Sequence, residues 1–146
     1  MAKFSSFRQN STLIRNGEWI RVGDEYDDLE INTRGFTDAY YDAQAARQRR
    51  AAQKYGGDER KLLTAERREI NIECLIEHVL LEPPVRNLTD DAGVPVTADQ
   101  FFDLLRDPDY PELFLACFKA AAQVGQQRAG VLDEAKGNSA PPLAGN

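Results

Sequence analysis

The feature that most constrains the fold of this chain is a long apolar helical pattern that runs into two consecutive prolines. The pattern covers residues 64–82, and Pro83-Pro84 follows it directly. Its apolar members occupy more than one stripe of the expected helix: Ile70, Cys74, Leu75, Ile76, Val79, Leu80 and Leu81. A helix with so wide an apolar surface lies at the centre of a core or under a partner. The prolines are expected to end it, because proline has no backbone N–H and pushes the preceding residue out of the helical region.

Three other segments carry helix signals. The stretch TDAYYDAQAARQRRAAQKYGG begins at Thr37, a residue type that caps helices, and ends on a Gly-Gly pair. Thr97 stands three residues before Gln100, and this spacing predicts a capping box for a helix that carries two phenylalanines. Pro111 suits the first turn of a last helix, whose apolar residues recur at helical spacing up to about residue 124.

Strand signals are fewer and shorter than helix signals. Two runs rich in β-forming residues, 19–22 and 29–33, flank a polar break and predict an N-terminal β-hairpin with a longer loop. A second short hairpin or tight loop is predicted where Asp91-Ala92-Gly93 separates two apolar runs. The expected fold is therefore α+β and mostly α-helical: an N-terminal β-hairpin followed by about four helices, with a short central turn or hairpin.

The chain of 146 residues is long enough for one domain with its own core. Residues 1–16 are polar and show no clear period, so we expect a flexible arm there, followed by a single globular domain over residues 17–128. Residues 129–146 are small and rich in Pro and Gly, which predicts a disordered tail. No apolar run approaches the ~20 residues of a membrane span, and we predict neither membrane association nor a secretory signal.

The pair Asp90 and Asp91 followed by Gly93 first suggests a calcium loop. Such a loop needs oxygen donors at alternate positions. Counted from Asp90, the third and fifth positions are Ala92 and Val94, whose side chains carry no oxygen. Asp and Gly also favour turns for backbone reasons alone, and a turn is the prediction.

His78 is the single histidine, and it lies four residues after Cys74 on the same predicted helix. With Cys117 these residues number three, but they lack the paired, closely spaced cysteines of a structural zinc site. We expect both cysteines to be reduced, buried thiols. No orienting group for a Cys–His nucleophile and no Gly-rich phosphate loop are identified. The sequence therefore predicts a protein that is not an enzyme, with no catalytic residue, no metal and no cofactor.

A basic run, RQRRAAQKYGGDERK, begins at Arg47 and ends at Lys61. It is either a solvated helix face or a dock for a nucleic acid or an acidic protein surface. The net charge of −6 argues against a general nucleic-acid binder, so a protein partner is favoured. The acidic stretch DEYDDLE at residues 24–30 is a candidate on a neighbouring copy, and that pairing would orient head-to-tail self-assembly.

Aromatic and Arg residues mark the best candidates for an interface, because both types are enriched at interfaces and Tyr and Arg tolerate water. Aromatic residues serve a core just as readily, and that alternative stays open for each of them. The predicted partner-binding residues are Tyr40, Tyr41, Arg47, Arg49, Arg50, Phe101 and Phe102.

The order of local phrases along the chain is distinctive. The hairpin EWIRVGD…LEINTRG precedes AYYDAQAARQRR, and INIECLIEHVLLE, the turn NLTDDAGVPVT and FFDLLRDPDYPELFLACFKAA follow. From about Glu18 to Gly125 this order resembles the tail assembly chaperones of long-tailed bacteriophages and of related prophage and gene-transfer particles.

That resemblance implies a non-catalytic protein that forms homo-oligomers and acts in the host cytoplasm during tail morphogenesis. Its expected partners are the long, helical tape-measure protein and the tail-tube protein, and it is expected to be absent from the finished particle. Two other classes stay open. One is a structural head–tail or tail completion protein that is retained in the virion. The other is a small nucleic-acid-binding regulator that uses the basic run.

Overall fold

A three-stranded antiparallel sheet organises the larger part of the chain. Its strands are β1 (Glu18–Arg21), β2 (Glu30–Thr33) and β3 (Leu80–Arg86), in the order β1-β2-β3. The predicted N-terminal hairpin is confirmed: β1 and β2 pair with Ile20 opposite Ile31. These two side chains are buried, which matches the alternation expected of a sheet with one covered face.

The structure is a computed structural model that describes residues 1–126. Residues 11–125 form one unit, which holds the sheet and all five α-helices of the described chain. Met1–Asn10 and Gln126 belong to a second unit, where a single 3-10 turn covers Phe4–Phe7 and Gln9 forms an antiparallel bridge with Gln126. The disordered tail predicted over residues 129–146 lies outside the described residues.

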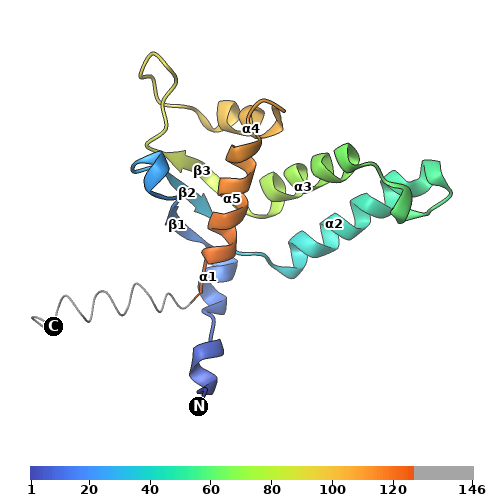
Figure 1. Cartoon of the computed structure of the whole chain (residues 1–146), viewed down its shortest axis with the longest axis horizontal. Helices are drawn as coiled ribbons and strands as arrows, with labels where there is room; N and C mark the ends of the chain where they lie inside the picture. The colour runs from blue at the N-terminus through green and yellow to red at the C-terminus, as the bar shows by residue number, and fades with distance from the viewer. Residues whose placement is uncertain (127–146) are drawn as a thin grey trace, which may run out of the picture. The chain divides into compact units, whose positions relative to one another are not determined.

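The five helices carry the labels used in Figure 1. They are α1 (Ser11–Asn16), α2 (Asp38–Ala51), α3 (Thr64–His78), α4 (Ala98–Arg106) and α5 (Pro111–Gln123). The capping box before α4 is confirmed, because the Gln100 backbone N–H donates to the Thr97 hydroxyl at 3.2 Å and the Thr97 N–H donates to the Gln100 side chain at 2.9 Å. Pro111 begins α5, as expected.

The N-terminal boundary differs from the prediction. We expected a flexible arm over residues 1–16, yet the last six of these residues form α1. Leu13 of this helix packs against the core, and the Gly35 backbone N–H donates to the carbonyl oxygen of Ile14 at 2.9 Å. The apolar pair Leu13-Ile14 therefore anchors a segment that is too short to show a clear hydrophobic period.

The end of α3 is a second correction. The predicted helix extended to residue 82, but α3 ends at His78 and the next residues form β3. Leu80 pairs with Thr33 and Val85 pairs with Ile31 of β2, with a register shift between the two pairs. Because β3 is an edge strand, its two prolines are tolerated there. The apparent excess of apolar surface on the helix thus belongs in part to a strand.

The core lies between the sheet and the helices that cover it. In Figure 1, α5 runs across the sheet, and α4 lies near β3. The largest fully buried side chains come from every one of these elements: Phe101, Ile31, Leu75, Leu105, Val79, Val124, Thr33, Pro84, Cys74 and Cys117. The fold is α+β and mostly helical, as predicted.

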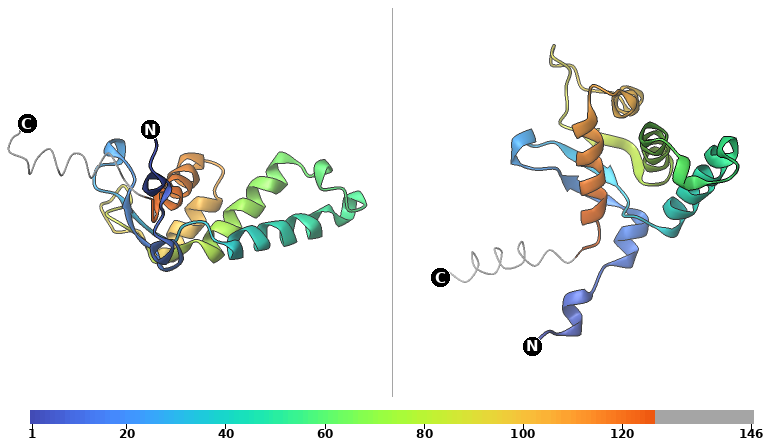
Figure 2. Two further views of the ribbon diagram at one scale, coloured as in Figure 1. Left: turned by 90° about the horizontal axis from the view of Figure 1, so that it is seen from below. Right: turned by 45° about the vertical axis from the view of Figure 1, so that its right-hand side comes forward.

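The helices α2 and α3 pack against each other and extend away from the sheet (Figures 1 and 2). A 3-10 turn (Ala52–Tyr55), a Gly-Gly pair and a further 3-10 turn (Glu59–Lys61) join them. We call this helical pair, residues 38–78, the arm. Its distal part, residues 49–68, is the arm tip.

Candidate binding surfaces

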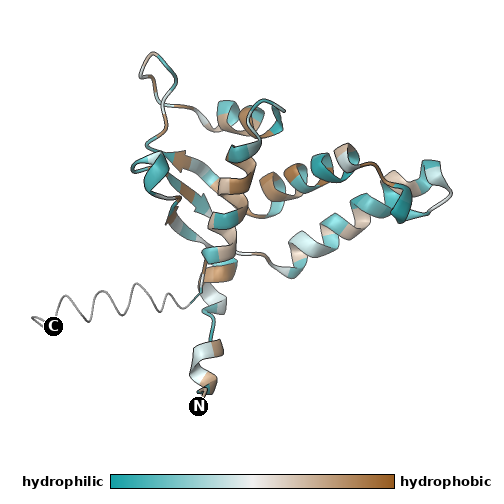
Figure 3. Ribbon diagram, viewed as in Figure 1, coloured by the Kyte–Doolittle hydropathy of each residue, from teal (hydrophilic) through white to brown (hydrophobic). Residues whose placement is uncertain are grey.

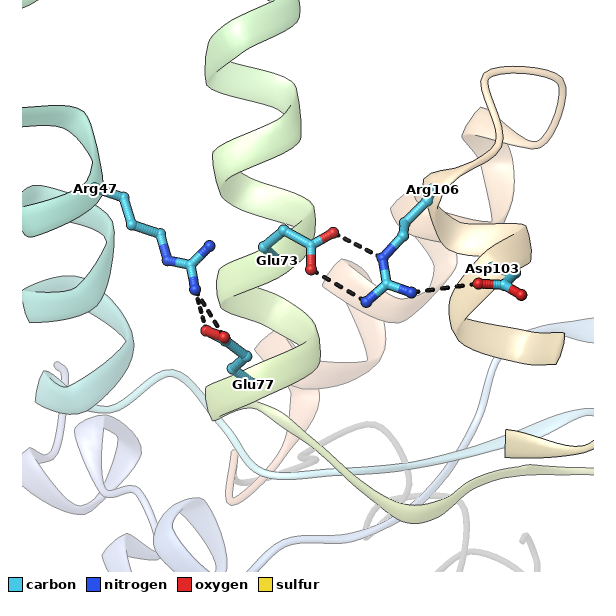
Figure 4. Close-up of polar contacts among 5 residues, drawn as sticks. All are labelled: Arg47, Glu73, Glu77, Asp103 and Arg106. Carbon is cyan, nitrogen blue, oxygen red and sulfur yellow. Dashed lines mark hydrogen bonds and ion pairs between the residues drawn. The ribbon is translucent and has the colours of Figure 1, made fainter. Parts of the chain in front are cut away.

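Polar side chains join the two helices of the arm. The Arg47 guanidinium binds the Glu77 carboxylate through both oxygens, one of them at 2.7 Å. The Gln44 side-chain amide donates to Asn71 Oδ1 at 2.7 Å. On the other side of α3, Glu73 accepts from Arg106 of α4 at 2.8 and 3.1 Å (Figure 4). Helix α3 is therefore held through charged residues on two sides, with Glu77 reaching α2 and Glu73 reaching α4.

One carboxylate organises the junction of the arm tip. Glu66 forms an ion pair with Lys54, accepts from the Leu63 backbone N–H at 2.9 Å, and accepts from the Tyr55 hydroxyl at 2.8 Å. The Lys54 ammonium and the Leu63 N–H both favour the charged carboxylate, so they lower the pKa of Glu66 from 4.5 to about 2. Glu66 thereby ties the start of α3 to the 3-10 turn that follows α2.

The arm tip is basic and carries an exposed apolar side chain. Residues 47–69 hold eight basic and four acidic residues. Four exposed cations of the arm tip make no ion pair within residues 1–126: Arg49, Arg50, Lys61 and Arg68. Leu63, between the last two, is 59% exposed. The arm tip therefore presents several positive charges that are unpaired in the described chain, and one exposed leucine side chain.

The loop before α4 contains the turn that the sequence predicts. The Asp90 carboxylate accepts from the backbone N–H groups of Ala92 and Val94, both at 2.9 Å, and the Asp90 N–H donates to the Val94 carbonyl oxygen. Gly93 has φ +82, a left-handed conformation that glycine adopts without strain. The Asp90 carboxylate therefore serves the backbone of the turn, and the turn leads into a short antiparallel bridge between Thr89 and Pro95.

This loop forms one wall of a groove of about 880 Å³. The other walls come from α4, the start of α5 and the β1–β2 connection. Apolar side chains line its interior: Leu29, Leu88, Val96, Leu104 and Leu113. Carboxylates stand around them: Asp90, Asp91, Asp103, Asp107, Asp109 and Glu112. We call this the acidic groove.

No Lys or Arg is among the described residues that line the acidic groove. Residues 87–112 contain seven acidic residues and one basic residue, Arg106. The Arg106 guanidinium already binds Glu73 and Asp103 (Figure 4). At the rim, the Tyr26 hydroxyl donates to Glu112 at 3.2 Å, and the negative charge of Glu112 raises the pKa of Tyr26. The groove thus keeps a strong negative charge over an apolar interior.

A third surface is a cluster of aromatic rings between α2 and α5. The rings of Phe36 and Phe118 lie 4.7 Å apart, those of Phe36 and Tyr40 lie 4.9 Å apart, and Phe114 lies 6.1 Å from Phe118. Tyr41 extends the cluster, with its ring 5.2 Å from that of Tyr40. Tyr41 is 54% exposed and Phe118 is 40% exposed. We call these five residues the aromatic cluster, and two of them are exposed to solvent.

The residues predicted to bind a partner fall into different environments. Arg49 and Arg50 are exposed near the end of α2, and Tyr41 is exposed near its start. Arg47 is half-buried in its ion pair with Glu77, and Phe102 packs partly against the core. For these five residues, partner binding stays a prediction.

The other two predicted residues lie in the core. Phe101 is fully buried and Tyr40 is 3% exposed, so neither side chain is presented to a partner in this structure. For Phe101 the reason is helix geometry, since α4 turns it toward the sheet while the adjacent Phe102 stays at the margin. Tyr40 is covered because Phe36 packs against its ring.

Sequence reasoning missed Phe36 and Phe118 as a pair, because they lie far apart in the sequence and on different elements. It also missed the acidic groove, which four separate segments build. The acidic stretch at residues 24–30 was noticed, and its Tyr26 and Leu29 do line that groove.

Within residues 1–126 no group of three or more His, Cys, Asp and Glu side chains is arranged to hold a metal ion. Cys74 and Cys117 are free, buried thiols, as predicted. Burial raises the pKa of Cys117 to about 12 and also raises the pKa of Cys74. Both thiols are therefore protonated at neutral pH, when a nucleophile needs the thiolate.

Comparison with known proteins returned no relative: no family model, no curated protein and no solved structure matches this chain. The resemblance to tail assembly chaperones stays a prediction. In the described part of the chain, none of the helices has the length and apolar character needed to cross a membrane.

Proposed function

We propose that this chain is a non-catalytic tail assembly chaperone that binds the helical tape-measure protein of a phage and helps to recruit tail-tube subunits. The observation that carries the proposal is the aromatic cluster, in which Tyr41 and Phe118 remain open to solvent beside three further rings. Exposed aromatic residues that form a contiguous surface mark sites of protein association. The sequence resemblance supplies the identity of the client.

The cluster suits a helical client for a geometric reason. Phe114 and Phe118 are four residues apart and share one face of α5, while Phe36 and Tyr41 border that face from the start of α2. Hydrophobic segments recur along α5 in Figure 3. An amphipathic client helix places its apolar residues at intervals of three and four, so its apolar face matches a row of rings of this kind.

The role requires several copies along a long client. One small aromatic surface gives modest affinity, but copies that act together on one client gain avidity without any new contact. Such a protein protects exposed apolar faces of the client until the tail tube encloses it. It does no chemistry on the client, in keeping with the protonated state of both thiols.

The test is co-expression with the tape-measure protein, followed by affinity capture and light scattering of the complex. Phe118→Ser is expected to lower the affinity for the client at least about tenfold, because a truncated aromatic anchor removes one of the largest contributions to an interface. Val94→Ser is the matched control, since Val94 is also exposed but lies outside the aromatic cluster.

Failure of the wild-type chain to keep the client soluble would overturn the proposal. Equal loss of binding in Phe118→Ser and Val94→Ser would also overturn the assignment of the aromatic cluster as the binding surface. Recovery of this chain from purified, mature tails would favour the structural class of protein over the chaperone.

A further inference from the structure

We propose that the arm tip of one copy docks in the acidic groove of a second copy. The inference deepens the proposed function by saying how copies are brought together. It needs no client, so it is tested on this chain alone and its failure would leave client binding untouched. The two surfaces are complementary in charge, in apolar character and in accessibility.

Charge is the first match between the two surfaces. The stretch 47–69 around the arm tip carries eight basic and four acidic residues, whereas residues 87–112 around the groove carry seven acidic residues and one basic residue. Four exposed cations of the tip (Arg49, Arg50, Lys61 and Arg68) have no ion-pair partner within residues 1–126, and neither do Asp91 and Asp109 at the groove. Opposite potentials of this kind steer association and fix its orientation.

Apolar complementarity is the second match. Leu63 is 59% exposed and lies between the exposed cations Lys61 and Arg68 in the sequence. The interior of the groove is lined by leucines, among them Leu88 and Leu104, inside a rim of carboxylates. When Leu63 of one copy enters the groove of another, the cations of the tip meet the carboxylates of the rim around it. An apolar centre with a polar rim is the usual arrangement of a specific interface.

Accessibility decides which copy supplies the tip. In all three views the arm tip points away from the loop that carries Asp90 and Asp91, although both belong to the same unit (Figures 1 and 2). Within one copy the tip therefore lies away from the loop that forms one wall of the groove, and the contact we propose joins two copies. Because two different surfaces meet, the association is head-to-tail and closes into a ring or grows into a filament.

The acidic stretch at residues 24–30 supplies only part of the groove. We predicted that this stretch docks against the basic run of a neighbouring copy. Tyr26 and Leu29 line the groove, but all six carboxylates that line it come from residues 90–112. The candidate acceptor is therefore a composite surface rather than the DEYDDLE segment alone.

A charge-swap experiment tests the contact directly. The arm-reversed variant is Lys61→Glu with Arg68→Glu, and the groove-reversed variant is Asp91→Lys with Asp109→Lys. These four side chains are exposed and hold no ion pair in the described chain, so their exchange leaves the fold intact. Asp90 and Asp107 are kept, because their carboxylates accept hydrogen bonds from the backbone of their own turns.

The matched control is Lys3→Glu with Lys119→Glu. It changes the net charge by as much as the arm-reversed variant does, but at exposed cations outside both surfaces. Each protein is first checked by circular dichroism, and its mass is then followed by sedimentation velocity as concentration and salt are varied. Association of the wild-type chain is expected to weaken as salt rises, because added ions screen the opposed charges.

The expected pattern is specific to a head-to-tail contact. Wild-type chain and control associate, while each reversed variant alone associates at least about a hundredfold more weakly, because like charges then oppose each other. An equal mixture of the two reversed variants recovers the association, since an acidic tip now meets a basic groove and a basic tip meets an acidic groove.

Three outcomes would overturn the proposal. The first is a wild-type chain that stays monomeric up to ~1 mM, the weak end of specific association. The second is a control that loses association as much as the reversed variants do. The third is a mixture of folded reversed variants that fails to associate.

Discussion

The arm (residues 38–78) and the rest of its unit (residues 11–37 and 79–125), which we call the body, are stabilised by different interactions. The body buries large side chains such as Ile31 and Phe101 completely, whereas the arm buries smaller ones such as Ala52 and also joins its helices through ion pairs and side-chain hydrogen bonds. Full burial of one large apolar side chain contributes about 1.5–3 kcal/mol, while an exposed ion pair contributes roughly 0–1 kcal/mol. Most of the stability therefore resides in the body.

Helix α3 shows the division within one element. Cys74 and Leu75, in its second half, are fully buried in the core, while its first half carries the exposed Arg68. Packing in the core thus fixes the second half of α3, and the first half presents a charged side chain to solvent. A protein built in this way can change its binding surface by mutation at the arm tip with little loss of stability.

The largest expected effect concerns Phe101. Phe101→Ala leaves a cavity in the body and is expected to lower the free energy of unfolding by about 3–5 kcal/mol. Chemical denaturation monitored by circular dichroism measures the change, with Phe102→Ala as the half-buried control that costs less. A stable Phe101→Ala variant that loses only partner binding would instead restore Phe101 to the interface where the sequence first placed it.

Two glycines provide a matched test of body against arm. Gly17 has φ +88, and a β-carbon there would lie 2.8 Å from the Thr33 carbonyl oxygen, so Gly17→Ala is expected to cost at least ~2 kcal/mol. Gly56 has φ +68 with nothing within 4 Å of such a β-carbon, so Gly56→Ala costs about 1 kcal/mol from backbone strain alone. Denaturant melts of both variants measure the difference. Equal losses would contradict the view that the arm tip is open and the body is closely packed.

The parts of the fold that the sequence predicted well are those that depend on local sequence patterns. The Thr97–Gln100 capping box, the Pro111 helix start and the hairpin before α2 each depend on residues close in the sequence. The β3 strand was missed because its pairing partner, β2, lies about fifty residues earlier, and a continuous apolar run does not separate a strand from a buried helix. Pro83-Pro84 indicated a break but not its position.

The candidate surfaces were harder to predict than the fold. Tyr41 and the basic arm tip are recognisable from residue type, because each lies within one helix or its adjoining turns. The aromatic cluster and the acidic groove depend on which segments meet in space. The sequence alone does not place Phe36 against Phe118 or bring Leu29 and Leu113 to one groove. The sequence also does not show which of two adjacent phenylalanines is buried: Phe101 lies in the core, whereas Phe102 lies at its margin.

A smaller effect is expected at the N-terminus of α4, a helix that forms one wall of the acidic groove. Thr97→Ala removes the acceptor of the Gln100 backbone N–H and is expected to lower stability by about 1 kcal/mol. Thr97→Ser keeps the hydroxyl and should restore most of the loss. Thermal unfolding of both variants measures the change. A Thr97→Ala variant as stable as the wild type would show that water satisfies this helix end without the cap.

The smallest effect is a change with pH that is confined to the arm tip. Binding to Lys54 and the Leu63 N–H lowers the pKa of Glu66 from 4.5 to about 2 in the folded chain. A carboxylate with a lowered folded pKa stabilises the fold above its unfolded pKa, and this contribution is lost as the pH falls toward the folded value. Protection of arm-tip amides against hydrogen exchange should therefore decrease as the pH falls from about 4.5 toward about 2, while protection of β2 falls less.

Glu66→Gln separates this effect from general acid unfolding. The amide keeps an acceptor for the Tyr55 hydroxyl but has no charge for Lys54, so the arm tip of this variant should be less protected even near neutral pH. Between pH 4.5 and about 2, its protection factors should then vary less than those of the wild type. If the two proteins lose arm-tip protection in parallel across that range, Glu66 does not hold the tip and the division between a polar arm and an apolar body is drawn in the wrong place.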